Sequence, residues 1–337
     1  MKLAISSLVL SVSSSLFAAD KVSFETYVEG LQQEAVQKGF SAEFAETHLS
    51  ELTYLKRAVK ADKNQPEFKE TLDTYLPKRV PEWKVKRARK AYKDNLPLLK
   101  KIGKKYGVQP RFIVSLWALE TNFGRIQGKM PIIDSIATLA YDGRRETFFK
   151  RQLWASLQIL DEGHIDKDKF VGSWAGAMGQ CQFMPTSFIA YAADGDEDGK
   201  KDIWNNKADV FASIANYLKS EGWRGNRTWG RQVQLPEGFD KSLLMPKGSK
   251  GRKQWLQNWK KAQQSLTFWS DQGVTRMDGR PLPKANIDGV LITPDDANGR
   301  VYLGYNNYKS LMHWNRSYYF VTSVGHLADR IGYPKVQ

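Results

Sequence analysis

The chain has 337 residues, of which 41% are hydrophobic and 26% are charged, so it can bury a sizeable core and has an ordinary globular balance. Its formal net charge of +15 indicates an anionic partner, such as nucleic acid, anionic lipid or an acidic cell-wall polymer. The single cysteine, Cys181, excludes an internal disulfide, and the lack of a long apolar run after the first residues excludes a permanent membrane span.

Residues 1–19 are predicted to be a secretory signal peptide. Lys2 precedes an apolar run over residues 3–10, and Ala18 and Ala19 offer a cleavage site. The run is too short for a permanent anchor, and no cysteine lies near it for lipid attachment. Export argues against nucleic acid as the partner of the basic surface, so we expect a soluble exported protein.

Residues 20–105 predict an N-terminal α domain. Ser23 and Ser41 are suited to cap its first two helices. Three prolines are expected to break its later helices: Pro77, Pro81 and Pro97. The lysine- and arginine-rich stretch 83–107 is either a solvated helix face or a surface that concentrates the protein on an anionic polymer.

The stretch 110–124 predicts the central helix of the chain. Pro110 suits its first turn, and Gly124 suits the left-handed position just past its end. Five apolar residues form one face at helical spacing: Phe112, Ile113, Leu116, Trp117 and Phe123. Glu120 points the same way. Burial would raise the pKa of this carboxyl toward that of a general acid, whereas the alternative is a rim glutamate paired with an arginine or a backbone N–H.

The spacing of apolar residues predicts two further helices, over 133–141 and 148–160. The dense motif 173–185 follows them. Its three small residues before Met178 allow the backbone to approach a ligand or another helix closely, and Ser173 and Gln182 add hydrogen-bonding side chains. The alternative is plain packing of a loop on a helix. Another helix, ended by Gly222, is expected after residue 209.

The acidic stretch 194–209 resembles the start of an EF-hand calcium loop. The expected oxygen ligands are the side chains of Asp194, Asp196 and Asp198 and the carbonyl of Lys200, with Gly199 at the sharp turn. Asn205 stands where the loop normally ends in glutamate, so Asp209 is expected to close the shell, with Asp202 as its rival. The alternative is a solvated acidic turn without metal.

Residues 227–305 predict a small β-rich domain, because glycine, proline and aspartate punctuate short strand-like runs. Four strands and one helix are expected: 232–235, 274–277, 290–293 and 300–304, with the helix over 255–262. The segment 306–337 returns to helical spacing after the β-rich part.

Several motifs resemble the lytic murein transglycosylase B family. They are ALETNFG at 118–124, AGAMG at 175–179, QFMP at 182–185, ANYL at 215–218 and WNRS at 314–317. The resemblance implies a mainly α (α+β) fold. It implies a lysozyme-like catalytic core over 106–226, which contains the EF-hand-like loop 194–209. The helical domain 20–105 precedes this core, the β-rich domain 227–305 is an insertion, and the segment 306–337 belongs to the core again.

The resemblance also implies the function and the site. It predicts cleavage of the bond between N-acetylmuramic acid and N-acetylglucosamine in peptidoglycan, leaving a 1,6-anhydro end, with Glu120 as the acid and base. The expected substrate-binding residues are Ser173, Met178, Gln182, Phe183, Tyr217, Trp314, Asn315, Tyr318 and Tyr319. A structural Ca²⁺ is expected, with no cofactor for the chemistry. The implied protein is a soluble periplasmic monomer that binds peptidoglycan strands and no nucleic acid.

A count of carboxylates gives the mechanism that we expect. Glycosidases usually use two, whereas the matched motifs contain one outside the acidic loop. We therefore predict that Glu120 works alone and that the 2-acetamido group of the substrate takes the second role. The alternatives are a muramidase that uses water, a non-catalytic peptidoglycan-binding protein of the same fold, and an exported nucleic-acid binder supported only by charge.

Overall fold

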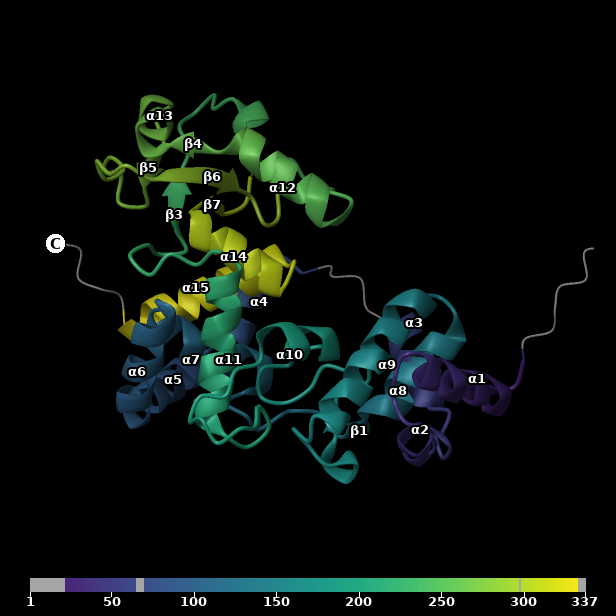
Figure 1. Cartoon of the computed structure of the whole chain (residues 1–337). Coiled ribbons are helices and arrows are strands. Elements are labelled where there is room, and N and C mark those ends of the chain that lie inside the picture. The colour runs from purple at the N-terminus through teal and green to yellow at the C-terminus, as the bar shows by residue number, and fades with distance from the viewer. Residues whose placement is uncertain (1–21, 65–69, 297, 333–337) are drawn as a thin grey trace, which may run out of the picture. The chain divides into compact units, whose positions relative to one another are not determined.

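The computed structural model describes residues 22–64, 70–296 and 298–332 (Figure 1). These residues form two compact units, 22–52 and 53–332. The predicted signal peptide lies outside the described residues. The segment 53–105, which the sequence places in an N-terminal α domain, belongs to the second unit. None of the helices in the described ranges has the length and hydrophobicity that crossing a bilayer requires.

The first unit contains two helices, α1 (Phe24–Gln37) and α2 (Ala42–Leu49). Both predicted N-caps are confirmed. The Ser23 and Ser41 hydroxyls each accept a hydrogen bond of 3.1 Å from the backbone N–H three residues further on. These bonds satisfy donors that the first turn of a helix leaves without a partner, and so they fix where each helix begins.

Helices make up most of the second unit: α3 (Lys56–Lys63), α4 (Leu72–Arg79), α5 (Glu82–Asp94), α6 (Leu96–Tyr106), α7 (Pro110–Thr121), α8 (Ile132–Asp142), α9 (Glu146–Asp161), α10 (Pro185–Tyr191), α11 (Lys207–Ser220), α14 (Asn306–Trp314) and α15 (Tyr318–Gly332). The short strands β1 (Met130–Pro131) and β2 (Val171–Gly172) pair antiparallel, and the 3₁₀ turn η1 (Lys167–Lys169) directly precedes β2. Pro81 and Pro97 lie at the starts of α5 and α6, but Pro77 lies inside α4, so it does not break that helix.

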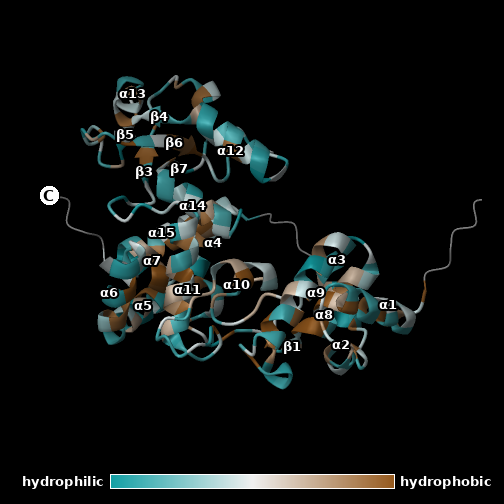
Figure 2. Cartoon of the chain, viewed as in Figure 1, coloured by the Kyte–Doolittle hydropathy of each residue, from teal (hydrophilic) through white to brown (hydrophobic). Residues whose placement is uncertain are grey.

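The helix α7 forms the centre of the second unit, where it packs against α5, α6, α11 and α15 (Figure 1). Every residue from 111 to 119 is buried, so this helix is buried on all sides and not only along the one apolar face that the sequence predicts. The polar residues of this helix have partners. Ser115 donates to the Val324 carbonyl at 2.7 Å, and Arg111 pairs with Asp329 at 2.8 Å. In Figure 2 the brown of hydrophobic residues is visible on α7 and along α8.

The β-rich part contains a five-stranded antiparallel sheet in the order β4-β6-β7-β3-β5. Its elements are β3 (Gly230–Gln234), η2 (Lys241–Leu243), α12 (Gly251–Ala262), β4 (Gln264–Ser265), α13 (Leu266–Asp271), β5 (Thr275–Arg276), β6 (Asp288–Ile292) and β7 (Val301–Gly304). The four predicted strands and the helix are present with shifted ends, whereas β4 and α13 were not predicted. Trp269 is completely buried in a hydrophobic cluster that this part forms for itself.

Candidate active site

Glu120 stands in the last turn of α7, and the residue as a whole is partly exposed. The indole of Trp314 donates a 2.6 Å hydrogen bond from Nε1 to Glu120 Oε1. Burial raises the pKa of Glu120 to about 7, although the hydrogen bond from Trp314 and the charge of Arg79 both lower it. The effect of desolvation on the pKa is therefore larger than the two opposing effects together, and the carboxyl can give up and take back a proton near neutral pH.

Aromatic rings surround the indole that holds Glu120. Trp314 lies 4.7 Å from the ring of Tyr217 and 5.3 Å from that of Phe183, measured between ring centroids. Tyr191 extends the cluster, with its ring 4.3 Å from that of Tyr217. These residues come from α10, α11, α14 and the 173–185 motif. The cluster thus fixes the donor of Glu120 from several parts of the chain at once.

A partly buried polar network adjoins the aromatic cluster through Tyr191 and Tyr217, and the sequence did not reveal it. The Glu221 carboxylate accepts hydrogen bonds from the Tyr191 hydroxyl at 2.7 Å, from Arg252 at 2.8 Å and from His313. The Tyr217 hydroxyl donates to the His313 carbonyl at 2.7 Å. Because His313 directly precedes Trp314, the network holds the backbone from which the indole reaches Glu120.

The loop after α7 has an unusual backbone. The helix ends at Thr121, and the left-handed C-cap predicted at Gly124 is taken by Asn122, whose φ is 51°. Phe123, with a φ of 62°, and Gly124, with a φ of 78°, continue in that region, which is rare for a bulky side chain. Gly124 is needed because a Cβ there would lie 2.2 Å from Oε1 of Gln180.

Gln180 joins the two main sequence motifs, although sequence reasoning did not select it. Its side-chain oxygen accepts a 2.7 Å hydrogen bond from the Trp117 indole of α7, and its side-chain nitrogen donates to the Trp204 carbonyl at 2.8 Å. Its own carbonyl accepts a hydrogen bond from Thr121 at 3.1 Å. These contacts place the 173–185 motif against the end of the helix that carries Glu120.

The predicted polar residues of the 173–185 motif bind backbone groups, those of the motif itself and that of Gln127 in the loop after α7. The Ser173 hydroxyl accepts from the Ala177 backbone N–H at 3.0 Å, and the Gln182 side chain donates to the carbonyls of Gly179 and Gln127 at 3.0 and 3.2 Å. Both side chains are partly exposed, so contact with a ligand stays a prediction for them. Part of the motif packs on α8, since a Cβ at Gly176 would lie 2.8 Å from Ile136.

Two of the predicted substrate contacts, Met178 and Phe183, are buried in the structure. Met178 has no exposed surface, and Phe183 is 3% exposed. Met178 pairs with the backbones of Gly172 and Phe183 beneath the surface, and Phe183 packs against Trp314. Both residues therefore pack within the protein in this structure, and their contact with a ligand stays a prediction. The apolar character of both side chains explains their burial.

The residues after Trp314 divide between the site and the scaffold. Asn315 ends α14 beside the indole and is partly exposed, so its predicted role stays open to test. The Tyr318 hydroxyl accepts a 2.9 Å hydrogen bond from the indole of Trp255 in α12. The Tyr319 hydroxyl donates to the Glu70 carbonyl at 2.9 Å and to Asp295. Both tyrosines connect distant segments, which is a structural role that the sequence did not predict.

The acidic loop brings together Asp194, Asp196 and Asp209, whose carboxylate oxygens lie within 4.8 Å of one another. Such oxygens suit a hard cation such as Ca²⁺, and Gly199 makes the predicted sharp turn with a φ of 90°. Burial raises the pKa of Asp209 to about 6, although backbone N–H groups of the loop lower it. The residues present therefore fit a calcium site.

The predicted ligand Asp198 and the rival Asp202 are not part of this three-carboxylate cluster in the described ranges. Within the described ranges, the three-carboxylate group does not include Asp198, whose carboxylate instead accepts a 2.9 Å hydrogen bond from the Lys200 backbone N–H. The rival Asp202 accepts from the backbone N–H groups of Trp204 and Asn205, each at 2.9 Å. The choice of Asp209 over Asp202 agrees with the geometry, and the Lys200 carbonyl stays a prediction.

Comparison with known proteins identifies the relatives of this chain. The model of the transglycosylase SLT domain family matches residues 23–329. The membrane-bound lytic murein transglycosylase B of Escherichia coli K12 is 30% identical over 238 residues, which are 69% of this chain and 59% of that protein. The chain thus matches little more than half the length of this curated relative.

Comparison with solved structures finds similar folds among lytic transglycosylases. SltB3 from Pseudomonas aeruginosa, in complex with NAG-anhNAM-pentapeptide, has a TM-score of 0.84 at 34% identity, over 92% of this chain and 79% of that one. The Escherichia coli lytic transglycosylase Slt35, in complex with calcium, has a TM-score of 0.73 at 26% identity, over 91% of this chain and 93% of that one. The predicted fold class is confirmed.

Proposed function

This chain belongs to the transglycosylase SLT domain family, and from that premise we propose that it is a lytic transglycosylase of peptidoglycan. The proposed reaction cleaves the β-1,4 bond between N-acetylmuramic acid and N-acetylglucosamine and leaves a 1,6-anhydro end. The supporting observation is the Glu120 carboxyl, which accepts from Trp314 and is protonated up to a pH of about 7. The SltB3 complex with a NAG-anhNAM-pentapeptide agrees with this substrate class.

In the proposed mechanism Glu120 acts twice. The protonated carboxyl donates its proton to the glycosidic oxygen, and the acetamido carbonyl of the muramic residue attacks the anomeric carbon as the glycosidic bond breaks. The ionised Glu120 then takes the proton of the 6-hydroxyl, whose oxygen closes the anhydro ring and displaces the acetamido oxygen. The positive charge of Arg79 lowers the pKa of Glu120 and thus favours the ionised form that the second step needs.

Product analysis separates this proposal from its alternatives. Purified peptidoglycan digested by the enzyme should release fragments with anhydro ends, which are one water lighter than hydrolysed ends in a mass spectrum. Hydrolysed ends alone would make the protein a muramidase. No release of either product, with retained binding to peptidoglycan, would make it a binding protein. Action in the periplasm as a monomer, and the division into domains at residues 106, 227 and 306, are further parts of this proposal.

We propose that Ca²⁺, held by Asp194, Asp196 and Asp209, is structural. Removal of the ion with a chelator should lower the melting temperature, because a ligand that binds only the folded state stabilises it. At about 100 times its dissociation constant the ion contributes about 2.7 kcal/mol. At ~2–4 °C per kcal/mol for a domain of this size, the shift is several degrees.

A matched variant tests whether the three carboxylates are responsible. Asp196→Asn removes one charged ligand but keeps an acceptor for the 2.7 Å hydrogen bond from Asn206. Its melting temperature should no longer respond to chelator or to added Ca²⁺. An unchanged melting curve of the unmodified protein, with and without chelator, would remove the metal from this account.

A further inference from the structure

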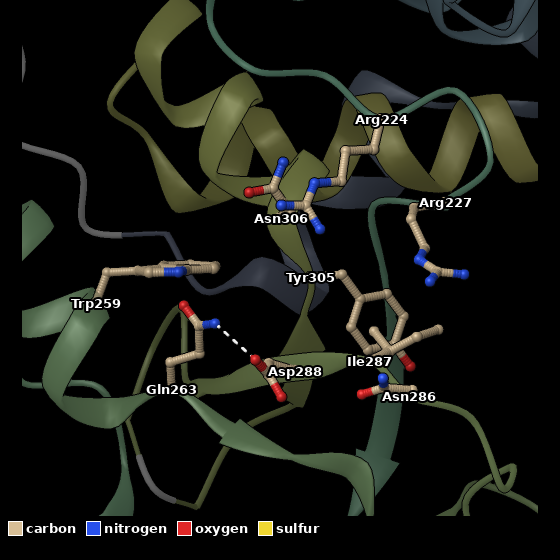
Figure 3. Close-up of a pocket in the computed structure, with 9 residues that line it drawn as sticks. All are labelled: Arg224, Arg227, Trp259, Gln263, Asn286, Ile287, Asp288, Tyr305 and Asn306. Carbon is tan, nitrogen blue, oxygen red and sulfur yellow. Dashed lines mark hydrogen bonds between the residues drawn. The ribbon is translucent and has the colours of Figure 1, made fainter.

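A second cavity lies apart from Glu120 and from every residue predicted to touch the glycan. It has a volume of about 340 Å³ and is lined by Arg224, Arg227, Trp259, Gln263, Asn286, Ile287, Asp288, Tyr305 and Asn306. The lining comes from the loop after α11, the end of α12, the start of β6 and the start of α14. Figure 3 shows the Arg224 guanidinium beside Asn306, across from Trp259 and from the hydrogen-bonded pair Gln263 and Asp288.

The two arginines of this cavity have free guanidinium groups. In the described ranges, neither Arg224 nor Arg227 makes an ion pair or a side-chain hydrogen bond. Lys309, in the first turns of α14, is close enough to feel the charge of Arg224 but does not line the cavity. Burial lowers the pKa of Lys309 first, and the nearby charge of Arg224 lowers it further. The cavity therefore offers two guanidinium groups that have no ion pair among the described residues, together with one lining carboxylate, that of Asp288.

The loop that carries the arginines is held rigidly from inside. Asn307, which is completely buried, donates to the carbonyls of Arg224 and Arg227 at 2.9 and 2.8 Å and accepts from the Arg224 backbone N–H at 2.8 Å. Gln109 donates to the carbonyls of Gly225 and Arg227. Gly225 is required there, because a Cβ would lie 2.5 Å from the Gly107 carbonyl. The backbone is thus fixed before any ligand arrives, which reduces the entropy lost on binding.

The charged and polar side chains that line the cavity indicate which class of ligand it would bind. Two guanidinium groups suit carboxylate oxygens, and the amides of Gln263, Asn286 and Asn306 suit peptide groups. Asp288 would accept a hydrogen bond from an ammonium group, and its charge opposes a ligand that is only anionic. A short peptide with a free carboxylate and a free amine satisfies all three requirements, whereas inorganic phosphate satisfies one.

We propose that this cavity binds the stem peptide of a peptidoglycan strand, through its carboxylate at Arg224 and Arg227 and its amine at Asp288. This inference rests on the proposed function for the source of the peptide. The site recognises peptide groups away from the scissile bond, so it selects which strands bind and leaves the chemistry at Glu120 unchanged.

The test measures binding of a sugar-free pentapeptide by calorimetry. Arg224→Ala/Arg227→Ala should weaken binding about 10- to 100-fold, since hydrogen bonds to charged groups contribute about 1.5–3 kcal/mol. The control Lys253→Ala/Lys260→Ala removes the same charge from exposed positions of α12 and should change the affinity less than twofold. Asp288→Asn keeps an acceptor for the hydrogen bond from Gln263. It should weaken binding of a pentapeptide whose amine is free, but not binding of the same peptide with an acetylated amine.

Three results would overturn the proposal: no pentapeptide binding, equal binding by the arginine variant, or equally strong binding of inorganic phosphate to the unmodified protein. A second measurement distinguishes failure of this proposal from failure of the proposed function. The arginine variant should release anhydro products from peptide-free glycan at the unmodified rate. Absence of those products in both proteins would contradict the proposed reaction, while the pentapeptide affinities would still decide the cavity.

Discussion

The Glu120→Gln variant should lose about 10²–10⁴-fold in the rate of product release, which is the contribution of one positioned acid and base. Glutamine has nearly the same shape and keeps an oxygen to accept the 2.6 Å hydrogen bond from Trp314, so the aromatic cluster should stay in place. What the variant lacks is the exchangeable proton. The measurement is the initial rate of release of anhydro fragments from purified peptidoglycan, with sedimentation of the protein with the same material as a readout of binding.

A matched control separates loss of the proton from a general effect of the amide. Glu237→Gln makes the same chemical change at an exposed position and should keep the unmodified rate. If Glu120→Gln retained more than about a tenth of the rate, the roughly hundredfold minimum expected for an acid and base would not be met. Full binding with lost turnover would support the proposed role, and loss of both would indicate that the site had collapsed.

Several features of the fold could be predicted from the sequence, because they depend on local chemistry. Ser23 and Ser41 cap their helices because a hydroxyl at that position reaches the first-turn N–H groups whatever the rest of the chain does. The convergence of Asp194 and Asp196 likewise follows from spacing within one loop. Such features need only a few consecutive residues, and these are visible in the sequence.

The support of the site could not be predicted, because it depends on residues far apart in the chain. Glu221 and His313 are 92 positions apart, and neither lies in a pattern that suggests a hydrogen bond between them. Tyr319 is separated from Glu70 by 249 positions, and the structure shows a hydrogen bond to the scaffold at a residue for which the family resemblance implied substrate contact. The burial of Met178 has the same cause, since only tertiary packing decides which face of a loop is covered.

The strained backbone after α7 shows why the site differs from its sequence expectation. A helix that ended on Gly124 would have had no bulky residue in the left-handed region. The structure instead places Phe123 there, 9% exposed and packed against Trp117 with ring centroids 5.5 Å apart. Such strain persists only where the surroundings impose it. Here the contacts of Gln180 with α7 and the edge-on packing of the rings supply the constraint.

Glu120 should also make the folded protein less stable as the pH rises, and Glu120→Gln should remove this effect. Burial raises the pKa of the folded carboxyl from 4.5 to about 7, so the folded state holds the proton more tightly than the unfolded state. Stability contributed by the protonated group is complete below pH 4.5 and is lost as the pH rises to about 7. At 1.36 kcal/mol per pKa unit, the ionised carboxylate lowers the free energy of unfolding by about 3 kcal/mol above that range.

Denaturant unfolding at pH 4.5 and pH 8 measures this difference directly. Relative to the unmodified protein, Glu120→Gln should be nearly neutral at the lower pH and more stable by as much as about 3 kcal/mol at the higher pH. Trp314→Phe removes a hydrogen bond that lowers the pKa of Glu120, so it should deepen the loss at pH 8 beyond its packing effect. In the Glu120→Gln background that pH-dependent part should vanish. An equal effect of Glu120→Gln at both pH values would show that the carboxyl titrates as an exposed group, and the proposed general acid would lose its physical basis.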